Sequence, residues 1–291
     1  MTDLPDIAGA NGVALPALGL GTYGMSPAQL QTMIPAALQA GLRHIDTAQV
    51  YRNEGAVGDL VVASGVPRQD LFLTTKIWVA NYAPGAFEVS LEASLKRLRT
   101  DYVDLLLLHW PGSPVPLKDQ VAGLESAVKA GMARRVGLSN FNGAMAAEAV
   151  RLSAVPLATN QIEIHPYLNQ DLAIERTHRV GLSVTGYCAM AVGRVFAEPA
   201  LQRIAMERGR SIAQVVLRWL FQQGIATLTR STNPERIADN LRIFDFELSI
   251  DDMSQISALA DPAGRIVDPA GLAPVWDPTP GRASAPRHPS R

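Results

Sequence analysis

Short apolar runs alternate with longer amphipathic stretches along most of the chain. The run Val103–His109 is almost continuously apolar, which is typical of a strand buried on both faces of a parallel sheet. The longer stretches carry helix-end signals, such as Ser26 before Pro27 and Gly41 and Gly131 after a last turn. The pattern predicts eight strands, at Leu18–Gly21, His44–Asp46, Leu71–Lys76, Val103–His109, Arg135–Ser139, Ala158–Glu163, Ser183–Cys188 and Ile225–Thr229. It predicts a helix after each strand, at Pro27–Ala40, Glu54–Ser64, Pro84–Arg99, Leu117–Ala130, Gly143–Leu152, Asp171–Val180, Ser211–Phe221 and Pro234–Leu241.

This repeated alternation predicts an α/β fold with parallel strands, a (β/α)8 TIM barrel. A typical barrel needs about 250 residues, so the 291 residues fit one barrel with short extensions. The Ala-Asn-Gly turn inside Ile7–Leu15 predicts an N-terminal β-hairpin that plugs the barrel's N-terminal end. We expect residues 1–277 to form a single domain, with the hairpin in residues 1–16. Residues 278–291, rich in Pro, Arg and Ser, should form a disordered tail.

One motif favours a different fold. Gly19–Gly24 matches the G-x-G-x-x-G of dinucleotide-binding Rossmann domains, and Asp46 follows at about the expected spacing. Gly24, however, precedes the helix start at Pro27, so no glycine is left for close packing of strand and helix. The Tyr-x-x-x-Lys of short-chain Rossmann reductases does not occur in the chain. The Rossmann fold is therefore the weaker alternative.

Composition excludes several classes of partner. The net charge of −1 provides no basic field for nucleic acid or for an anionic membrane. A single cysteine allows no intrachain disulfide, which fits a reducing compartment. The N-terminus lacks the features of a signal peptide, and no apolar run approaches the ~20 residues of a membrane span. We therefore expect a soluble, cytoplasmic protein.

Four ionisable residues each follow an apolar run at successive strand ends: Asp46, Tyr51, Lys76 and His109. Because the C-terminal ends of barrel strands form one face, these side chains should converge there. Each alone has an ordinary interpretation: a helix cap, a loop anchor, a solvated strand end and a buried histidine. Lysine is scarce, at four of the 26 lysines and arginines, and genomic composition is the main explanation.

Taken together, the four residues predict a general acid whose pKa is shifted by its neighbours. A phenol with a pKa near 10 is a poor acid at neutral pH, and a nearby ammonium lowers that pKa. We expect Lys76 to act in this way on Tyr51, with Asp46 keeping Lys76 charged and oriented. His109 would hydrogen-bond a substrate carbonyl.

Several segments of the chain resemble the aldo-keto reductase family. Its members are TIM barrels that bind NADPH without a Rossmann fold and reduce aldehydes and ketones by hydride transfer. The similar segments run from Leu18 to Leu248 and include LGLGT, GLRHIDTAQVY, LTTKIW, LKRLRTDYVDLLLLHWP, VGLSNF and NQIEIHPY. The resemblance implies that Asp46, Tyr51, Lys76 and His109 form the family's catalytic tetrad, with Tyr51 as the proton donor.

The resemblance also implies NADPH as the cofactor. The implied cofactor-binding residues are Gly21, Thr22, Ser139, Asn140, Gln161, Tyr187, Arg230, Ser231, Thr232, Arg236 and Asn240. Among them, Ser139, Asn140 and Gln161 would hold the nicotinamide carboxamide and Tyr187 would stack on the ring. Arg230 and Arg236 would meet the 2′-phosphate, and Asn240 the adenine. Two segments depart from the family: Thr-Arg-Ser replaces the usual Pro-Lys-Ser at 229–231, and Tyr-Cys-Ala-Met replaces Tyr-Ser-Pro-Leu at 187–190.

The closing segment Gly264–Asp277 is similar to one branch of the family, the bacterial 2,5-diketo-D-gluconate reductase B type, whose members also reduce methylglyoxal. The similarity implies a C-terminal loop over the barrel mouth. It also implies a substrate pocket lined by Tyr23, Trp78, Trp110 and Trp276. We expect a monomer that acts on a small carbonyl compound and needs no metal, because His165 and His178 have no ligands at useful spacing.

Two other functions remain open. A TIM barrel with a low-pKa lysine at a strand end also suits a Schiff-base lyase, with Lys76 as the nucleophile. Some relatives of the fold serve as non-catalytic, NADPH-binding regulatory modules.

Overall fold

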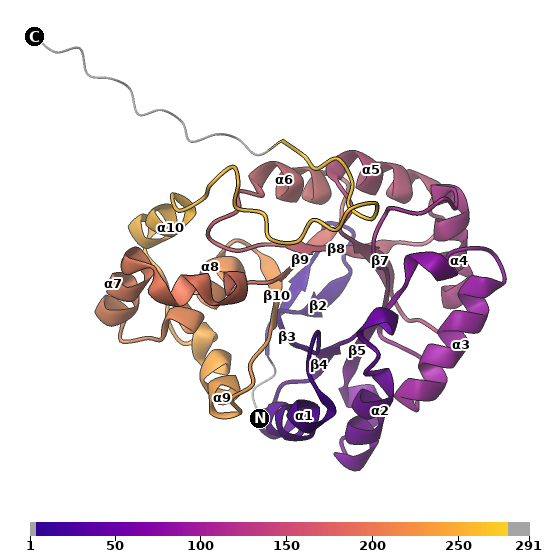
Figure 1. Ribbon diagram of the computed structural model, residues 1–291, viewed down its shortest axis with the longest axis horizontal. Coiled ribbons are helices and arrows are strands. Elements are labelled where there is room, and N and C mark those ends of the chain that lie inside the picture. The colour runs from indigo at the N-terminus through magenta and orange to yellow at the C-terminus, as the bar shows by residue number, and fades with distance from the viewer. Residues whose placement is uncertain (1–3, 279–291) are drawn as a thin grey trace, which may run out of the picture.

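The computed structural model describes residues 4–278, and its centre is a closed barrel of eight parallel strands (Figure 1). The strands are β3 (Leu18–Gly21), β4 (His44–Asp46), β5 (Phe72–Ile77), β6 (Leu105–Leu108), β7 (Val136–Ser139), β8 (Leu157–Glu163), β9 (Ser183–Tyr187) and β10 (Ile225–Thr229). The last strand, β10, pairs in parallel with β3 and so closes the barrel. The predicted TIM barrel is confirmed, and each strand bound lies within two residues of the predicted one.

Helices surround the barrel in chain order (Figure 1). Those that were predicted are α1 (Pro27–Gln39), α2 (Glu54–Ala63), α3 (Ala86–Leu98), α4 (Leu117–Lys129), α5 (Gly143–Leu152), α6 (Asp171–Arg179), α8 (Ile212–Gln222) and α9 (Glu235–Leu241). Two helices were not predicted: α7 (Pro199–Arg208), which precedes α8 in the same connection, and α10 (Ile250–Ser257), which follows the barrel. Short 3-10 helices complete the connections: η1 (Gln49–Tyr51), η2 (Arg68–Asp70), η3 (Val79–Asn81), η4 (Ala191–Ala197) and η5 (Arg242–Phe244).

The predicted hairpin is present and closes the N-terminal end of the barrel. β1 (Asp6–Ala8) pairs antiparallel with β2 (Ala14–Pro16), and Gly12 takes a φ of +79° in the turn between them. Leu15 is buried against Leu105, Leu107 and Ala158, which come from strands β6 and β8. The hairpin therefore fills the bottom of the barrel with an apolar side chain.

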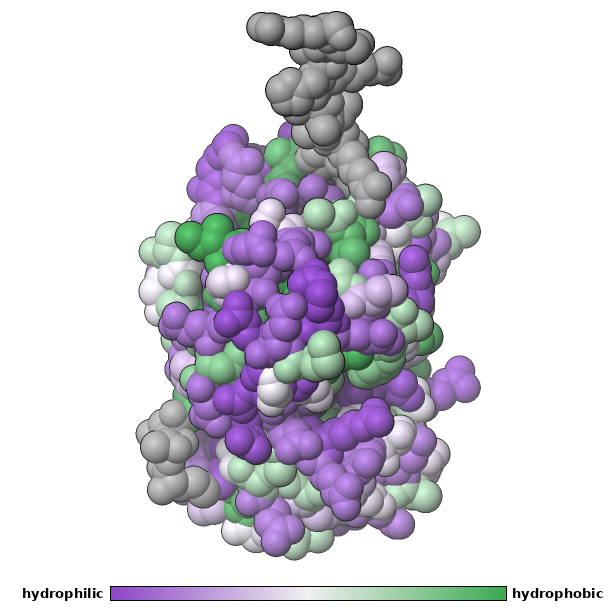
Figure 2. Space-filling view, turned by 90° about the vertical axis from the view of Figure 1, so that its left-hand side faces the viewer, coloured by the Kyte–Doolittle hydropathy of each residue, from purple (hydrophilic) through white to green (hydrophobic). Residues whose placement is uncertain are grey.

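The surface of one flank is mostly polar. Figure 2 shows the side on which α7, α9 and α10 lie, and hydrophilic residues cover most of it, with hydrophobic ones in small separate groups. In residues 4–278, no helix has both the length and the apolar character needed to cross a bilayer. Most of the buried apolar residues form one cluster between the barrel and its helices.

After α10 the chain crosses the barrel mouth (Figure 1). We call residues 264–277 the C-terminal strap. The backbone N–H of Gly112, in the loop after β6, donates to the carbonyl of Leu272 (3.0 Å). Asp277 accepts from the N–H of Gly143 at the start of α5 (2.7 Å). The expected loop over the mouth is therefore present. All but the first residue of the predicted tail lies outside the described residues.

Candidate active site

Lys76 lies at the centre of the polar cluster in the barrel. Its side chain, on β5, is completely buried, and its ammonium donates to Asp46 Oδ1 at the end of β4 (2.5 Å). The same Nζ donates to the carbonyl of Thr47 (3.0 Å) and lies 3.4 Å from the Tyr51 hydroxyl on η1. The structure thus brings together three of the four predicted residues around one ammonium.

His109, the fourth residue, follows β6 and faces the same cluster. Its ring lies 5.6 Å from the ring of Tyr51 at an interplanar angle of 76°. Burial, and then the charge of Lys76, hold the pKa of His109 well below its usual range. The imidazole is therefore neutral at physiological pH and keeps one ring N–H as a hydrogen-bond donor.

The protonation of Tyr51 differs from the sequence-based expectation. Burial raises the pKa of the Tyr51 phenol well above its usual value, and the nearby Asp46 carboxylate raises it further. The expected net lowering by Lys76 is wrong, because removal of the phenol from water outweighs the ammonium. Burial also lowers the pKa of Lys76, against the opposing effect of Asp46. Tyr51 consequently carries its proton throughout the neutral range.

A second chain of hydrogen bonds connects Asp46 with the ends of β7, β8 and β9. Gln161 Nε2 donates to Asp46 Oδ2 (2.9 Å), and Ser139 Oγ donates to the Gln161 carbonyl (3.0 Å). Asn140 Nδ2 donates to Ser139 Oγ (3.1 Å), and the Tyr187 hydroxyl donates to Asn140 Oδ1 (2.7 Å). The four residues expected around the nicotinamide therefore lie side by side next to the Lys76–Asp46 pair.

The loop after β3 closes the other side of the cluster. Gly21 pairs in register with Asp46, and Thr22 Oγ1 donates to the Asp46 carbonyl (3.0 Å). Asn53 Nδ2 donates to the Thr22 carbonyl (2.9 Å) and its Oδ1 accepts from Thr47 Oγ1 (2.8 Å). Asn53, which was not predicted, thereby fixes the loops on both sides of Asp46.

The residues expected to bind the adenosine end follow β10. Arg230, Thr232 and Arg236 are exposed, and Arg230 donates to the Gly24 carbonyl across the β3–β10 seam (3.3 Å). Ser231 Oγ donates to the Asn233 carbonyl (3.0 Å). Asn240 is buried and its amide donates to Thr229 Oγ1 (2.9 Å). Two guanidinium groups are therefore accessible here and Asn240 is held inside.

The segment after β9, where the sequence departs from the family, has an unusual backbone. Cys188, Ala191, Val192 and Gly193 all have positive φ, of 61°, 45°, 53° and 94°. For β-branched Val192 this region is sterically costly. Burial, followed by the neighbouring carboxylate of Glu163, raises the pKa of the Cys188 thiol to about 11. Cys188 is thus a protonated thiol at neutral pH.

Aromatic side chains line the mouth above the cluster. Tyr23 is 68% exposed and its ring lies 5.1 Å from that of Tyr51. Trp78 lies 5.4 Å from His109. Trp110 and Trp276 meet edge to face at 6.3 Å. Two of the four predicted pocket residues, Tyr23 and Trp78, thus contact the cluster. The other two, Trp110 and Trp276, join the loop after β6 to the C-terminal strap.

Sequence reasoning missed Gln49, which holds the Tyr51 turn against the Trp78 loop. Its Oε1 accepts from the Trp78 N–H (2.8 Å) and from Asn81 Nδ2 (2.9 Å). Its Nε2 donates to Ser90 and Ser94 of α3 (3.1 Å each). No motif singles out this glutamine. Its only signal is its position between Asp46 and Tyr51.

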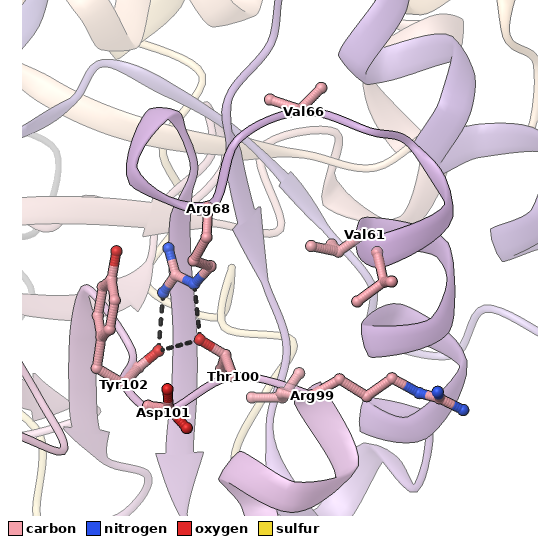
Figure 3. Close-up of a pocket in the computed structure, with 9 residues that line it drawn as sticks. Val61, Val66, Arg68, Arg99, Thr100, Asp101 and Tyr102 are labelled. Carbon is pink, nitrogen blue, oxygen red and sulfur yellow. Dashed lines mark hydrogen bonds between the residues drawn. The ribbon is translucent and has the colours of Figure 1, made fainter.

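A separate hollow of about 270 Å³ lies at the opposite end of the barrel, where α2 and α3 end. Figure 3 shows Arg68 in this hollow, bonded to Thr100 and to the Tyr102 carbonyl. It contains none of the predicted site residues. Within residues 4–278, no cluster of His, Cys, Asp and Glu has the arrangement of a metal site.

Comparisons with known proteins fit this arrangement. The profile of the Aldo/keto reductase family matches residues 17–261. Methylglyoxal reductase DkgB of Salmonella typhi is 40% identical over 268 residues, 91% of this chain and all of that protein. An aldo-keto reductase of Mycobacterium sp. (strain MCS) is 42% identical over 257 residues, 88% of this chain and 91% of that one.

Solved structures agree as well. A candidate 2,5-diketo-D-gluconic acid reductase B is 49% identical with a TM-score of 0.91, covering 93% of this chain and 98% of that one. A Bombyx mori aldo-keto reductase solved in complex with NADP is 31% identical with a TM-score of 0.83, covering 89% of this chain and 94% of that one.

Proposed function

The chain belongs to the aldo/keto reductase family, and on that premise we propose that it reduces small aldehydes and ketones to alcohols with NADPH, using Tyr51 as the general acid. Membership makes it an NADP-dependent oxidoreductase. The observation that carries the assignment of Tyr51 is the position of its hydroxyl, 3.4 Å from the Lys76 ammonium that Asp46 holds.

The residues around Tyr51 suit the cofactor. NADPH, when bound, supplies hydride to the carbonyl carbon. The side chains of Ser139, Asn140 and Gln161 would hold its carboxamide, and the Tyr187 ring would support one face of the nicotinamide. Arg230 and Arg236, with Ser231 and Thr232, would bind a 2′-phosphate, which favours NADPH over NADH.

We assign one role to each residue of the tetrad. Tyr51, protonated at neutral pH, gives its proton to the carbonyl oxygen as negative charge develops there. Lys76 then stabilises the phenolate, because an ammonium favours the charged form of its neighbour. Asp46 holds the ammonium in place. Neutral His109 donates a hydrogen bond to the carbonyl oxygen and orients the substrate.

The relatives and the pocket together suggest the substrate class. The names of the relatives refer to methylglyoxal and 2,5-diketo-D-gluconic acid, both small carbonyl compounds. Aromatic walls at Tyr23, Trp78, Trp110 and Trp276 suit a short substrate whose carbonyl enters between Tyr51 and His109. We place this activity in the cytoplasm and in a monomer.

The lyase alternative is less well supported. A nucleophilic lysine must be neutral, whereas Lys76 is ion-paired with Asp46 at 2.5 Å.

Replacement of Tyr51 by phenylalanine tests the proposal. We expect Tyr51→Phe to lower the kcat for methylglyoxal reduction at least ~10²-fold, the usual contribution of a positioned acid. NADPH binding should stay within about twofold, since the ring remains. NADPH oxidation measures the first quantity and quenching of protein fluorescence the second. Tyr23→Phe, which removes a neighbouring hydroxyl, is the matched control and should remain active. A Tyr51→Phe enzyme with near wild-type turnover would reject Tyr51 as the acid.

A further inference from the structure

Glu163 is a buried carboxylate that the mechanism above does not use. It ends β8, two residues beyond Gln161, and its side chain has no exposed surface. Side chains two residues apart on a strand point to the same side, so Glu163 lies on the face of β8 that carries Gln161. Burying a carboxylate without partners is strongly unfavourable. The partners of Glu163 therefore indicate what it does.

Three of the four partners come from one tripeptide of the C-terminal strap. Oε1 accepts from the backbone N–H of Ile266 (2.8 Å), and Oε2 accepts from that of Val267 (3.0 Å). The Arg265 guanidinium lies 3.6 Å from Oε2, and His165 is the fourth partner (2.9 Å). Two successive amides on one carboxylate fix both the position and the direction of the strap backbone.

The anchored tripeptide in turn holds an aromatic wall. The Arg265 guanidinium lies over the ring of Trp276 at 3.7 Å. Trp276 Nε1 donates to Asp268 Oδ1 (2.8 Å), and its ring meets Trp110, the residue after His109. At its far end the strap is fixed by Asp277. Contacts thus run without a break from Glu163 to Trp110 in the wall of the mouth.

We propose that Glu163 is a positioning residue that sets substrate specificity, because its carboxylate holds residues 265–267 and thereby keeps Trp276 against Trp110. This inference rests on the proposed function, in which the carbonyl enters at this mouth. A substrate long enough to touch Trp276 should depend on Glu163. A substrate as small as methylglyoxal should not.

Glu163→Gln tests the proposal, because the amide places an NH₂ donor where one carboxylate oxygen accepts. For a biphenyl aldehyde we expect KM to rise about tenfold, with kcat changed less than about threefold, as for loss of uniform binding. For methylglyoxal both constants should stay within about threefold, and NADPH affinity should be unchanged. Trp276→Ala should likewise raise the KM of the biphenyl aldehyde, and the double variant should raise that KM no further. Equal losses on both aldehydes, or none on either, would overturn the proposal.

Two further measurements keep the test independent of folding and of turnover. Arg265→Met leaves Glu163 in place and should raise the KM of the biphenyl aldehyde in the same direction. Arg151→Met, which removes an exposed arginine paired with Glu148 on α5, is its control. Trypsin should cleave Glu163→Gln after Arg265 faster than it cleaves the wild type, and equal cleavage rates would contradict the anchoring. If the wild type reduces no carbonyl compound while the strap still loosens in the variant, the proposed function fails and the anchoring stands.

Discussion

Buried ionisable side chains at two depths of the barrel show how burial sets the charge of single residues. Near the mouth, Lys76 is paired with Asp46. One layer below, His44 Nε2 lies 3.0 Å from Thr74 Oγ1, and the nearby Gly19 leaves room for the imidazole, since a Cβ there would lie 2.5 Å from His44 Nδ1. Burial, and then the charge of Lys76, lower the pKa of His44 to about 3.

The low pKa of His44 makes the free energy of unfolding depend on pH. The unfolded chain takes up a proton on His44 near pH 6.5, whereas the folded chain does so only near pH 3. Above pH 6.5, His44 is neutral in both states and its contribution to the free energy of unfolding is at its maximum. That contribution is lost as the pH falls toward 3, because the unfolded chain is protonated first. Between pH 6.5 and 5 the loss from this group should be about 1.5 kcal/mol.

His44→Gln should accordingly show a smaller fall in the free energy of unfolding over that pH interval than the wild type. Urea unfolding at each pH measures the difference. His178, at the surface of α6, has a pKa that burial also lowers, so His178→Gln is the comparison and should change the profile less than His44→Gln does. A His44→Gln profile parallel to the wild type would contradict the low pKa.

Helices α2 and α3 pack closely enough that one glycine is required between them. A Cβ on Gly58 would lie 2.4 Å from the Arg97 carbonyl oxygen and 2.7 Å from the Leu98 Cα, both backbone atoms that cannot move aside. Gly55, in the same helix, has nothing within 4 Å of such a Cβ. The two positions therefore form an internal pair of test and control.

We expect Gly58→Ala to destabilise the protein by about 1–3 kcal/mol, the usual cost of overpacking. Gly55→Ala should be neutral or stabilise by up to ~1 kcal/mol, because alanine restricts the unfolded chain. Thermal unfolding of both variants measures the contrast. Similar melting temperatures for the two would show that the helices separate without cost.

Elements that depend on local pattern were predictable from the sequence. The strand–helix alternation gave the barrel, and an apolar run before each polar residue placed Asp46, Tyr51, Lys76 and His109 at one mouth. Helix α7 was missed because the alternation leads one to expect a single helix after each strand. Helix α10 was missed although its capping box, Ser249 with Asp252, is readable in the sequence.

Features that depend on distant contacts were not predictable. Glu163 binds the N–H of Ile266, 103 residues away, and no local pattern connects them. The raised pKa of Tyr51 likewise results from its burial in the folded barrel and from the Asp46 carboxylate beside it. The alternation of side chains on β8 was the one available signal for Glu163, because it places that residue on the same face as Gln161.

For the whole molecule, the barrel separates stability from chemistry. Leu15 and its apolar neighbours fill the N-terminal end, whereas the polar cluster lies at the C-terminal ends of the strands. Catalytic groups of TIM barrels lie at that C-terminal face. A cavity at the N-terminal end should therefore weaken folding and leave the site intact.

Leu15→Ala should lower the free energy of unfolding by about 2–5 kcal/mol, the usual cost of a buried leucine. Below the unfolding transition, kcat/KM for methylglyoxal should match the wild type. Denaturant unfolding and steady-state kinetics on one preparation measure both. Val13→Ala, at the half-buried edge of the same hairpin, should cost much less stability. A large fall in kcat/KM for folded Leu15→Ala would show that the two ends are coupled.

The distribution of lysines has a practical consequence for handling the protein. Of the four lysines, Lys76 is enclosed in the barrel, and Lys96, Lys118 and Lys129 are exposed on the neighbouring helices α3 and α4. Reagents that couple to side-chain amines will therefore attach along this single flank and will not reach Lys76. Immobilisation through lysine side chains should therefore present this flank to the support.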